Sequence, residues 1–564
     1  MLPTFDLARA DYLISFGADF LGTWNSPVAQ SIGYGEMRQG RPGSRGKVVQ
    51  VESRMSQTGA NADEWIACRP GTEGMLALGI AHVILSQKLV PQSAVSPMAA
   101  RAGSQISGWS AGLRQYAPAE VEEQTGVNAS TIIRLAHEIA SGGSATAIVG
   151  GAPLAQSNGH FNAMAVNALE ALVDSGHQGG PILRFTPEPP LTDTTSQMAS
   201  PQASFASLNS FAQSALSGKT GPPQVLMLYE ANPIYSAPPA TRIREAIAKI
   251  PYIVSFGSFI DETSVQADLI LPDHAPLESW LESVPESGSF QSVINVAPPA
   301  VSPLHDTRPM TDVLLNLAKQ LGGDFAKALP FDSFDSMIKA ELVPLRAKGG
   351  SVKAETDDDF WQAVQAQGGW WSEPPKAGSK SAANFSNANG NQAPTPLATP
   401  EFAGSANDFP FYFQPYVTTS FGDGSAAHLP WMQELPDVLT SAMWSSWVEI
   451  NTKTAEKLGI QQGDLVEVAS PAGSLRVPAV LSPGIAPDLL AMPVGQGHEN
   501  FGRFASGHGA NPLSILAPVI EHNTGSLAWA ATRVKLIRMG GPEQAKLVLY
   551  AGGMSRFPHE EEPR

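Results

Sequence analysis

Short apolar runs alternate with segments of helical period over roughly the first 345 residues, and this alternation predicts an α/β fold. The buried parallel strands expected first lie at 11–17, 47–51 and 145–149. Helices are expected at 73–87, after the turn at 69–72, and across 119–141, where Asn128 is a candidate internal cap. The pattern therefore predicts a first parallel sheet with covering helices.

A second block with the same alternation of strand-like and helical segments follows, and a third block has a different pattern. The second has candidate strands at 224–229, 252–256 and 267–271 and candidate helices at 242–249 and 311–321. Residues 377–400 hold almost no large apolar side chain, which is typical of a mobile linker. Beyond it, short β-type runs separated by Gly, Pro and Asp turns lie at 447–451, 465–470, 473–480 and 489–493. These runs predict a small β-barrel.

The chain is therefore expected to divide into five parts. They are an α/β domain at 1–185, which lacks the first units of a complete sheet, a second α/β domain at 186–375, a flexible linker at 376–405, a β-barrel at 406–540 and a C-terminal tail at 541–564.

Charge and cysteine content exclude several functions. The 564 residues include 35 Lys and Arg against 52 Asp and Glu, a net charge of -17, which disfavours nucleic acid and anionic lipid as partners. Charged residues make up only 15% of the chain, which favours a surface partly covered by partner subunits. The single cysteine, Cys68, excludes an intrachain disulfide and a cysteine-ligated iron-sulfur cluster within the chain. We also expect no membrane-spanning segment and no export signal.

Candidate chemistry gathers at the predicted carboxyl ends of strands. The turns Gly17-Ala18-Asp19-Phe20, Glu52-Ser53-Arg54 and Gly150-Gly151 would meet at one sheet edge, where backbone N–H groups can bind a nucleotide. Each turn alone is equally typical of an ordinary connection. His498 and His508 flank a glycine-rich loop that is a candidate for ligand contact, although metal binding by the pair alone is not expected. Cys68 is interpreted as a structural thiol.

Several longer runs resemble one family in the same order along nearly the whole chain. They are DYLISFGADFLGTWNSPV, GSRGKVVQVESRMSQTGANADEWIACRPGTEGMLALGIAHVIL, VLMLYEANPIYSAP, FIDETSVQADLILPDHAPLESW and the tail from WVEINTKTAEKLGI to GANPLSILAP. These runs resemble the molybdopterin oxidoreductase family, which includes dimethyl sulfoxide, polysulfide and nitrate reductases and formate dehydrogenases. The resemblance implies two parallel-sheet α/β domains of that type followed by a C-terminal double-psi-like, dinucleotide-binding β-barrel.

The resemblance also implies where a molybdenum bis-pterin guanine dinucleotide would lie, in the crevice between the domains. Carried over by motif, one nucleotide arm would meet Gly17, Asp19, Glu52, Arg54, Gly71 and Thr72. The other arm would meet Glu230, Asn232, Pro233 and Asp261, and the pterins would face Gly495, His498, Asn511 and Pro512. These positions are either vestigial or cofactor-binding.

Departures from the family pattern decide the expected function. The chain begins after the family's cysteine cluster motif and its molybdenum ligand, it has Asp19-Phe20 where many members have Asn-Pro, and it lacks a Gly-Arg pair near Ser287. The segments GADFLGTW, QTGANADEW and LAWAATRV are most similar to the molybdopterin-like half of the large iron-sulfur subunit of alternative complex III, a bacterial quinol-oxidising assembly. The expectation is a non-catalytic subunit, without catalytic or metal-ligating residues and without its own cofactor.

This expectation carries a set of partners and a location. The resemblance implies an iron-sulfur protein that holds the clusters, polytopic quinol-binding membrane subunits and cytochrome c-type subunits, with this chain peripheral on the periplasmic face of the membrane. Two alternatives stay open. One is the cofactor-holding part of a split molybdenum bis-pterin reductase of the polysulfide or thiosulfate type, and the other is a free-standing nucleotide-binding module.

Overall fold

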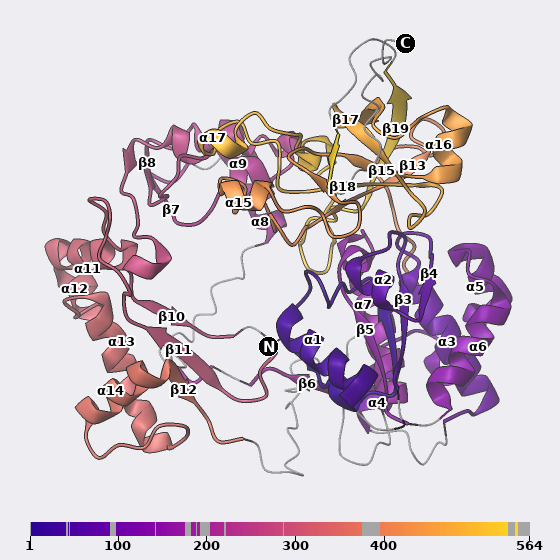
Figure 1. The fold of residues 1–564 in the computed structure, drawn as a ribbon, viewed down its shortest axis with the longest axis horizontal. Helices are drawn as coiled ribbons and strands as arrows, with labels where there is room; N and C mark the ends of the chain where they lie inside the picture. Colours follow the sequence, from indigo (N-terminus) through magenta and orange to yellow (C-terminus); the bar gives the residue numbers. More distant parts are fainter. Residues whose placement is uncertain are drawn as a thin grey trace, which may run out of the picture.

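The computed structural model describes residues 2–40, 43, 45–90, 97–141, 143–174, 182–187, 189–191, 204–218, 221–285, 287–374, 395–539 and 547–550. Figure 1 shows a first α/β region, a second region of sheets and helices on the other side, and a β-barrel that lies above the first region and beside the strands β7 (Val225–Leu228) and β8 (Tyr252–Ser255) of the second. The two α/β regions and the barrel expected from the sequence are therefore present.

The first region is built on four parallel strands in the order β4-β3-β2-β5. Their bounds are β2 Tyr12–Phe16, β3 Lys47–Val51, β4 Glu64–Ile66 and β5 Ala145–Val149. The prediction of β2, β3 and β5 is confirmed. β2 is buried along its whole length because the sheet has neighbours on both faces, which explains its unbroken apolar run.

Helices cover this sheet, and the largest core cluster lies between them and the strands. The helices are α1 Pro27–Gly35, α2 Gln57–Asn61, α3 Glu73–Gln87, α4 Pro97–Ser104, α5 Pro118–Thr125, α6 Ala129–Ala140 and α7 Gly159–Val173. A small antiparallel pair, β1 Pro3–Phe5 and β6 Leu183–Phe185, lies beside them. Asn128 precedes α6 as expected, but its side chain makes no capping bond. A Glu122 carboxylate oxygen accepts the Ala129 N–H at 3.0 Å in its place.

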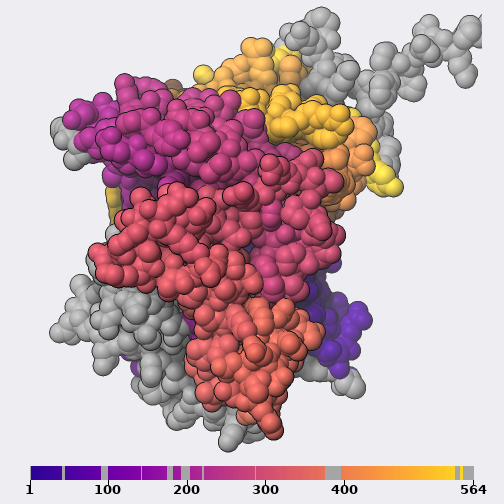
Figure 2. Space-filling view, turned by 90° about the vertical axis from the view of Figure 1, so that its left-hand side faces the viewer, coloured from indigo at the N-terminus to yellow at the C-terminus, as the bar shows by residue number. Residues whose placement is uncertain are grey.

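The second region begins with three short parallel strands in the order β7-β8-β9. They are β7 Val225–Leu228, β8 Tyr252–Ser255 and β9 Leu269–Ile270, each shorter than its predicted run and β9 less than half as long. Leu226, Leu228 and Ile253 pack with the helices α8 Phe205–Ser217 and α10 Ile243–Ile247. Figure 2 shows this part above the helices that follow it in the chain.

The rest of the second region is an antiparallel sheet, which the apolar pattern did not indicate, together with four helices, of which only the first along the chain was predicted, at 311–321. Its strands are β10 Leu281–Ser283, β11 Val293–Ala297 and β12 Gly369–Trp371, and its helices are α11 Met310–Leu321, α12 Gly323–Ala328, α13 Phe334–Leu342 and α14 Asp357–Gln367. β11 alternates buried and exposed side chains, since helices cover one face only. Short strands far apart in sequence carry little local pattern, and this explains the omission.

The C-terminal region is a closed barrel with the strand order β13-β18-β15-β17-β16-β19. The strands are β13 Phe411–Tyr416, β15 Val448–Asn451, β16 Leu465–Ser470, β17 Gly473–Ser482, β18 Leu489–Pro493 and β19 Thr532–Arg538. Two of its pairings, β13 with β18 and β15 with β17, are parallel and the others antiparallel. The helix α16 Thr452–Leu458 starts directly after β15, capped by Asn451.

The expected linker at 376–405 lies largely outside the described residues. Its last part is described and is bound to the first region, because the Thr395 N–H donates to Gln105 O at 2.7 Å and the Ser107 N–H donates to Thr395 O at 3.1 Å. Of the expected tail at 541–564, the described residues include β20 Val548–Leu549, which pairs with β14 Ala442–Met443. Among the helices that the structure describes, none is both long and apolar enough to span a membrane.

A buried ion pair joins the barrel to the first sheet. The Arg54 Nε and Nη2 atoms donate to Glu449 Oε1 at 3.1 and 2.8 Å, and the guanidinium lies 3.4 Å from the centre of the Tyr416 ring. The Tyr416 hydroxyl donates to the same carboxylate oxygen at 2.7 Å. Burial disfavours the charged guanidinium, but the Glu449 carboxylate outweighs burial and raises the pKa of Arg54. All three groups therefore depend on one another.

We expect Arg54→Ala to lower the free energy of unfolding by about 3–5 kcal/mol, because it leaves the Glu449 carboxylate buried without its partner. The double variant Arg54→Met with Glu449→Leu removes both charges and should recover most of this loss. Urea unfolding followed by tryptophan fluorescence would measure both. Equal losses of unfolding free energy in the single and double variants would contradict this account of the Arg54–Glu449 ion pair.

Candidate functional site

Protein atoms fill the space beside Gly17 and Gly151, which follow the carboxyl ends of β2 and β5. Gly17 follows β2 with φ +72°, and a Cβ atom at this position would lie 2.3 Å from Pro153 Cδ. Gly151 also approaches closely, since its own Cβ would lie 2.5 Å from Gly17 O. The glycine after β2 is therefore required by the packing of the neighbouring turn, and it does not leave an open cradle for a ligand.

Two carboxylates occupy the backbone donors at the start of α2. Asp19 Oδ1 accepts from the Thr58 N–H at 2.9 Å, and Glu52 Oε1 accepts from the Ser56 N–H at 2.7 Å. Burial outweighs these hydrogen bonds and raises the pKa of Glu52 to about 7. Free N–H groups at a helix start are what a phosphate would use, and here Asp19 and Glu52 already accept two of them.

The other residues of the first set are also engaged. Arg54, three residues after β3, binds Glu449 in the barrel strand β15. Gly71 lies against the segment before the barrel, because Asn158 Nδ2 donates to both Gly71 O and Ala398 O, at 2.9 and 2.8 Å. The Thr72 hydroxyl donates to Arg69 O at 2.8 Å, which closes the turn into α3. Each of these three residues thus makes a hydrogen bond within the protein.

The surroundings of Cys68 agree with the expectation that it is a structural thiol. The thiol is buried, and its sulfur lies 3.3 Å from the Thr72 hydroxyl oxygen. Burial raises the pKa of the Cys68 thiol, so the reactive thiolate is disfavoured.

The second set of expected residues gathers around a carboxylate that the sequence analysis did not select, Glu262. Asn232 Nδ2 donates to Glu262 Oε2 at 2.6 Å, and His498 Nδ1 lies 3.2 Å from Glu262 Oε1. The Glu499 N–H also donates to Oε1, at 2.7 Å. Burial acts to raise the pKa of Glu262, but the hydrogen bonds from His498 and Asn232 outweigh it and bring the pKa to about 2.

Tyr235 completes this contact between the second region and the barrel. Its ring stacks on His498 with centroids 3.8 Å apart, and its hydroxyl donates to Gln496 O at 3.0 Å. Asn511 Nδ2 donates to Tyr235 O at 2.9 Å. The structure therefore brings Asn232, His498 and Asn511 together, in an interdomain clamp formed with Glu262 and Tyr235.

The remaining expected residues shape the backbone around this clamp. Asp261 Oδ1 accepts the N–H groups of Thr263 and Ser264 at 3.0 and 2.6 Å, and Pro233 begins the short helix α9 Pro233–Ser236. Gly495 has φ +108° and lies against Phe421, and Pro512 is buried at the start of a turn. Glu230 is exposed, with φ +47°.

One signal in the sequence could have found a missed residue. Glu449 is the only charged residue in the apolar strand Val448–Asn451, and a carboxylate there requires a cationic partner when the strand is buried. Glu262 and Tyr235 offer no such signal, because their partners His498 and Gln496 come from a barrel loop more than 230 residues later.

The residues present do not fit a dinucleotide at the first arm, since carboxylates and protein packing fill it. The clamp has one unsatisfied group, because His498 Nε2 is buried and has no hydrogen-bond partner among the described residues. Metal ligation by His498 and His508 was not expected, and within the described parts of the chain no group of three or more His, Cys, Asp and Glu side chains could hold a metal ion.

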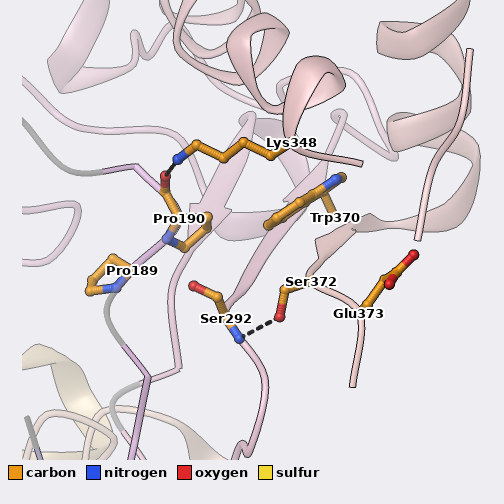
Figure 3. Close-up of a pocket in the computed structure, with 7 residues that line it drawn as sticks. All are labelled: Pro189, Pro190, Ser292, Lys348, Trp370, Ser372 and Glu373. Atoms are coloured by element: carbon orange, nitrogen blue, oxygen red, sulfur yellow. Dashed lines mark hydrogen bonds between the residues drawn. The ribbon is translucent and has the colours of Figure 1, made fainter. Parts of the chain in front are cut away.

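A cavity of about 400 Å³ lies elsewhere, between the antiparallel sheet and the segment that precedes it (Figure 3). It is lined by Pro189, Pro190, Ser292, Lys348, Trp370, Ser372 and Glu373. Lys348 Nζ donates to Pro190 O at 3.2 Å, so the one ammonium group on its wall is already bound to the protein. None of the expected site residues lines this cavity.

The low pKa of Glu262 makes the clamp sensitive to acid. Because the folded-state pKa lies below the usual 4.5, the stabilisation is complete above about pH 4.5 and is lost as the pH falls towards 2. We expect Glu262→Gln to lower the free energy of unfolding by roughly 2–3 kcal/mol at pH 7 and by much less near pH 2.

Urea titrations between pH 2 and 7 would measure this difference. Glu499→Gln is the matched control, because this neighbouring carboxylate is 65% exposed and should show little effect at any pH. A pH-independent loss in Glu262→Gln would contradict an ionised clamp.

Two family models match the chain. The molybdopterin oxidoreductase model matches residues 3–320, and the molydopterin dinucleotide binding domain model matches residues 432–525. The structure is similar to acetylene hydratase from Pelobacter acetylenicus, with a TM-score of 0.72, 15% identity and coverage of 95% of this chain and 79% of that one. This similarity concerns the fold.

Two curated relatives are similar over most of the sequence. The menaquinone reductase, molybdopterin-binding-like subunit of Nitratidesulfovibrio vulgaris is 28% identical over 544 residues, which cover 95% of this chain and 72% of the relative. The arsenate respiratory reductase molybdopterin-containing subunit of a Shewanella species is 24% identical over 89% of this chain and 70% of the relative. The molybdopterin oxidoreductase family model matches more than half of the chain, and the structure contains two parallel sheets and a closed barrel. The chain therefore belongs to the molybdopterin oxidoreductase family.

Proposed function

We propose that this chain is a non-catalytic, molybdopterin-oxidoreductase-like subunit of a membrane-bound quinol:electron-acceptor oxidoreductase of the alternative complex III type. Its role is to scaffold an iron-sulfur subunit in respiratory or photosynthetic electron transfer. The observation that carries the proposal is that residues expected to bind the first nucleotide arm already make hydrogen bonds within the protein. Arg54, the cation expected to meet a nucleotide, is withdrawn into a buried pair with Glu449, and Asp19 and Glu52 occupy the helix N–H groups.

The comparisons support the link to quinones. A relative that aligns with 95% of this chain is named as a molybdopterin-binding-like subunit of a menaquinone reductase. The single cysteine supports the placement of iron-sulfur clusters in another chain, because a cluster needs several thiolates.

The partners under this proposal are an iron-sulfur protein, polytopic quinol-binding membrane subunits and cytochrome c-type subunits. The chain itself is a peripheral subunit on the periplasmic face of the membrane. The low charged fraction, 15%, supports a surface that is covered in an assembly.

A second candidate function has one specific observation in its favour. His498 Nε2 is buried without a partner among the described residues, and Asn232 and Asn511 lie around the same clamp. These groups could face a pterin if the chain were the cofactor-holding part of a split molybdenum bis-pterin reductase. The filled first arm disfavours that function, and it equally disfavours a free-standing nucleotide-binding module.

Elemental and nucleotide analysis distinguishes these candidates. We expect the chain, purified with its native partners in mild detergent, to contain iron but no molybdenum, tungsten or guanine nucleotide. Inductively coupled plasma mass spectrometry and a nucleotide assay after acid release would measure these. Stoichiometric molybdenum or tungsten with guanine nucleotide would establish the split reductase instead.

Substitutions in the former cofactor positions should leave turnover unchanged. We expect Asp19→Asn and His498→Asn to keep quinol oxidation by the assembled complex within about twofold of the wild type, since neither side chain would contact a reacting group. The amide introduced by His498→Asn retains an N–H donor for Glu262 in place of the imidazole Nδ1. A hundredfold loss of turnover with the assembly intact would refute a non-catalytic role.

A further inference from the structure

Large apolar side chains gather on one outer edge of the barrel. We name this set the barrel-edge patch, and its members, with their exposed fractions, are Leu435 48%, Val438 56%, Leu439 40%, Trp444 52% and Tyr550 65%. Single exposed apolar side chains are ordinary, but a cluster of them usually marks an interaction surface.

Hydrogen bonds hold these residues in one rigid unit. Asp437 Oδ1 accepts the N–H groups of Leu439 and Thr440 at 3.2 and 2.8 Å, and the Ser441 N–H donates to Asp437 O at 2.9 Å. The Tyr550 N–H donates to Ser441 O at 2.8 Å, and strands β14 and β20 pair beside this contact. The patch therefore combines residues 435–444 with the end of β20.

Backbone strain is tolerated to present this surface. Ser441 and Trp444 both have positive φ, +57° and +60°, a conformation that is unusual for a bulky aromatic residue and costs roughly 1–2 kcal/mol. Glycine would relieve the strain at 444, yet the chain has a half-exposed tryptophan there. Trp444 also lines a cavity of about 10 Å³, together with Leu435 and Trp447 among others. Such strain is common where a side chain serves in binding.

Charge selects the kind of partner. From 417 to 452 the sequence has no Lys or Arg, and two carboxylates adjoin patch residues in the chain, the exposed Glu434 before Leu435 and the half-buried Asp437 before Val438. Anionic lipid attracts basic surfaces, so this acidic rim disfavours a membrane surface. It also disfavours a symmetric contact with a second copy, which would bring the same carboxylates together.

We propose that the barrel-edge patch is a docking surface for a partner polypeptide whose apolar centre is bordered by Lys and Arg residues. The proposal deepens the proposed function and rests on it, because it names the face by which this chain is held in its complex. Trp444 and Tyr550 act as apolar anchors, and Glu434 pairs with the basic rim of the partner.

The test compares two patch variants with two controls in the complete complex. Trp444→Gly removes the anchor and suits the positive φ, so the barrel should stay folded. Glu434→Lys reverses the rim charge. The controls are Phe325→Ala, at an aromatic residue that is 62% exposed on α12, and Glu355→Lys, at an exposed carboxylate before α14.

Affinity purification from native membranes in mild detergent would be combined with a photo-crosslinking amino acid at Val438. We expect one subunit of the complex to be cross-linked through a segment rich in Lys and Arg, and to bind at least tenfold more weakly to both patch variants. The controls should bind like the wild type, and all variants should keep their melting temperature within a few degrees.

Other outcomes would overturn the proposal. Unchanged affinity in both patch variants would refute the docking surface while leaving the proposed function intact, whereas a wild-type chain that copurifies with no membrane complex would refute the proposed function itself. Flotation of the isolated chain with phosphatidylethanolamine and phosphatidylglycerol vesicles, lost in Trp444→Gly, would assign the patch to lipid. A dimer that Trp444→Gly dissociates would assign it to a second copy.

Discussion

The arrangement of the three regions depends on a buried cation held against a buried anion. Arg54 lies at the end of the second strand of the first sheet, and Glu449 lies in a barrel strand 395 residues later. Neither charge is stable alone in an apolar interior, so each requires the other, and the Tyr416 hydroxyl and ring complete the pair. Backbone hydrogen bonds on both sides, from Met55 to Gly484 and from Ala486 to Ser53, fix the same contact. The barrel can therefore occupy one position over the first sheet.

The contact between the second region and the barrel also depends on a buried charge that needs partners, but here the partners are not cationic guanidinium groups. Glu262 is buried between the second region and the barrel, where amide, imidazole and backbone N–H groups stabilise its charge in place of a guanidinium. A barrel loop, 495–500, supplies part of this shell, so the second region is also tied to the barrel. The two contacts together tie the barrel to both other regions (Figure 1).

These contacts bear directly on function because they use residues that the family resemblance assigns to a cofactor. A residue whose hydrogen-bonding capacity is satisfied within the protein gains little from a ligand that would have to break those bonds. Arg54, Asp19 and Glu52 are satisfied in this way, and Pro153 fills the space over Gly17. Arg54 thus joins the first region to the barrel, whereas Asp19 and Glu52 fix the loops around α2 within the first region.

The sequence by itself determined several of the parallel strands and helices, since Lys47–Val51 and Glu73–Gln87 are almost continuously apolar runs whose lengths distinguish a buried strand from a buried helix. It also determined the family, through ordered motifs along the chain, and the barrel strands between 448 and 493. It did not indicate the antiparallel sheet, whose strands β11 and β12 lie more than 70 residues apart. Only the tertiary structure decided that Arg54 binds Glu449 and that His498 binds Glu262. The hydrogen-bond partner of a buried charge is chosen by proximity in space, and spacing along the chain does not encode that proximity.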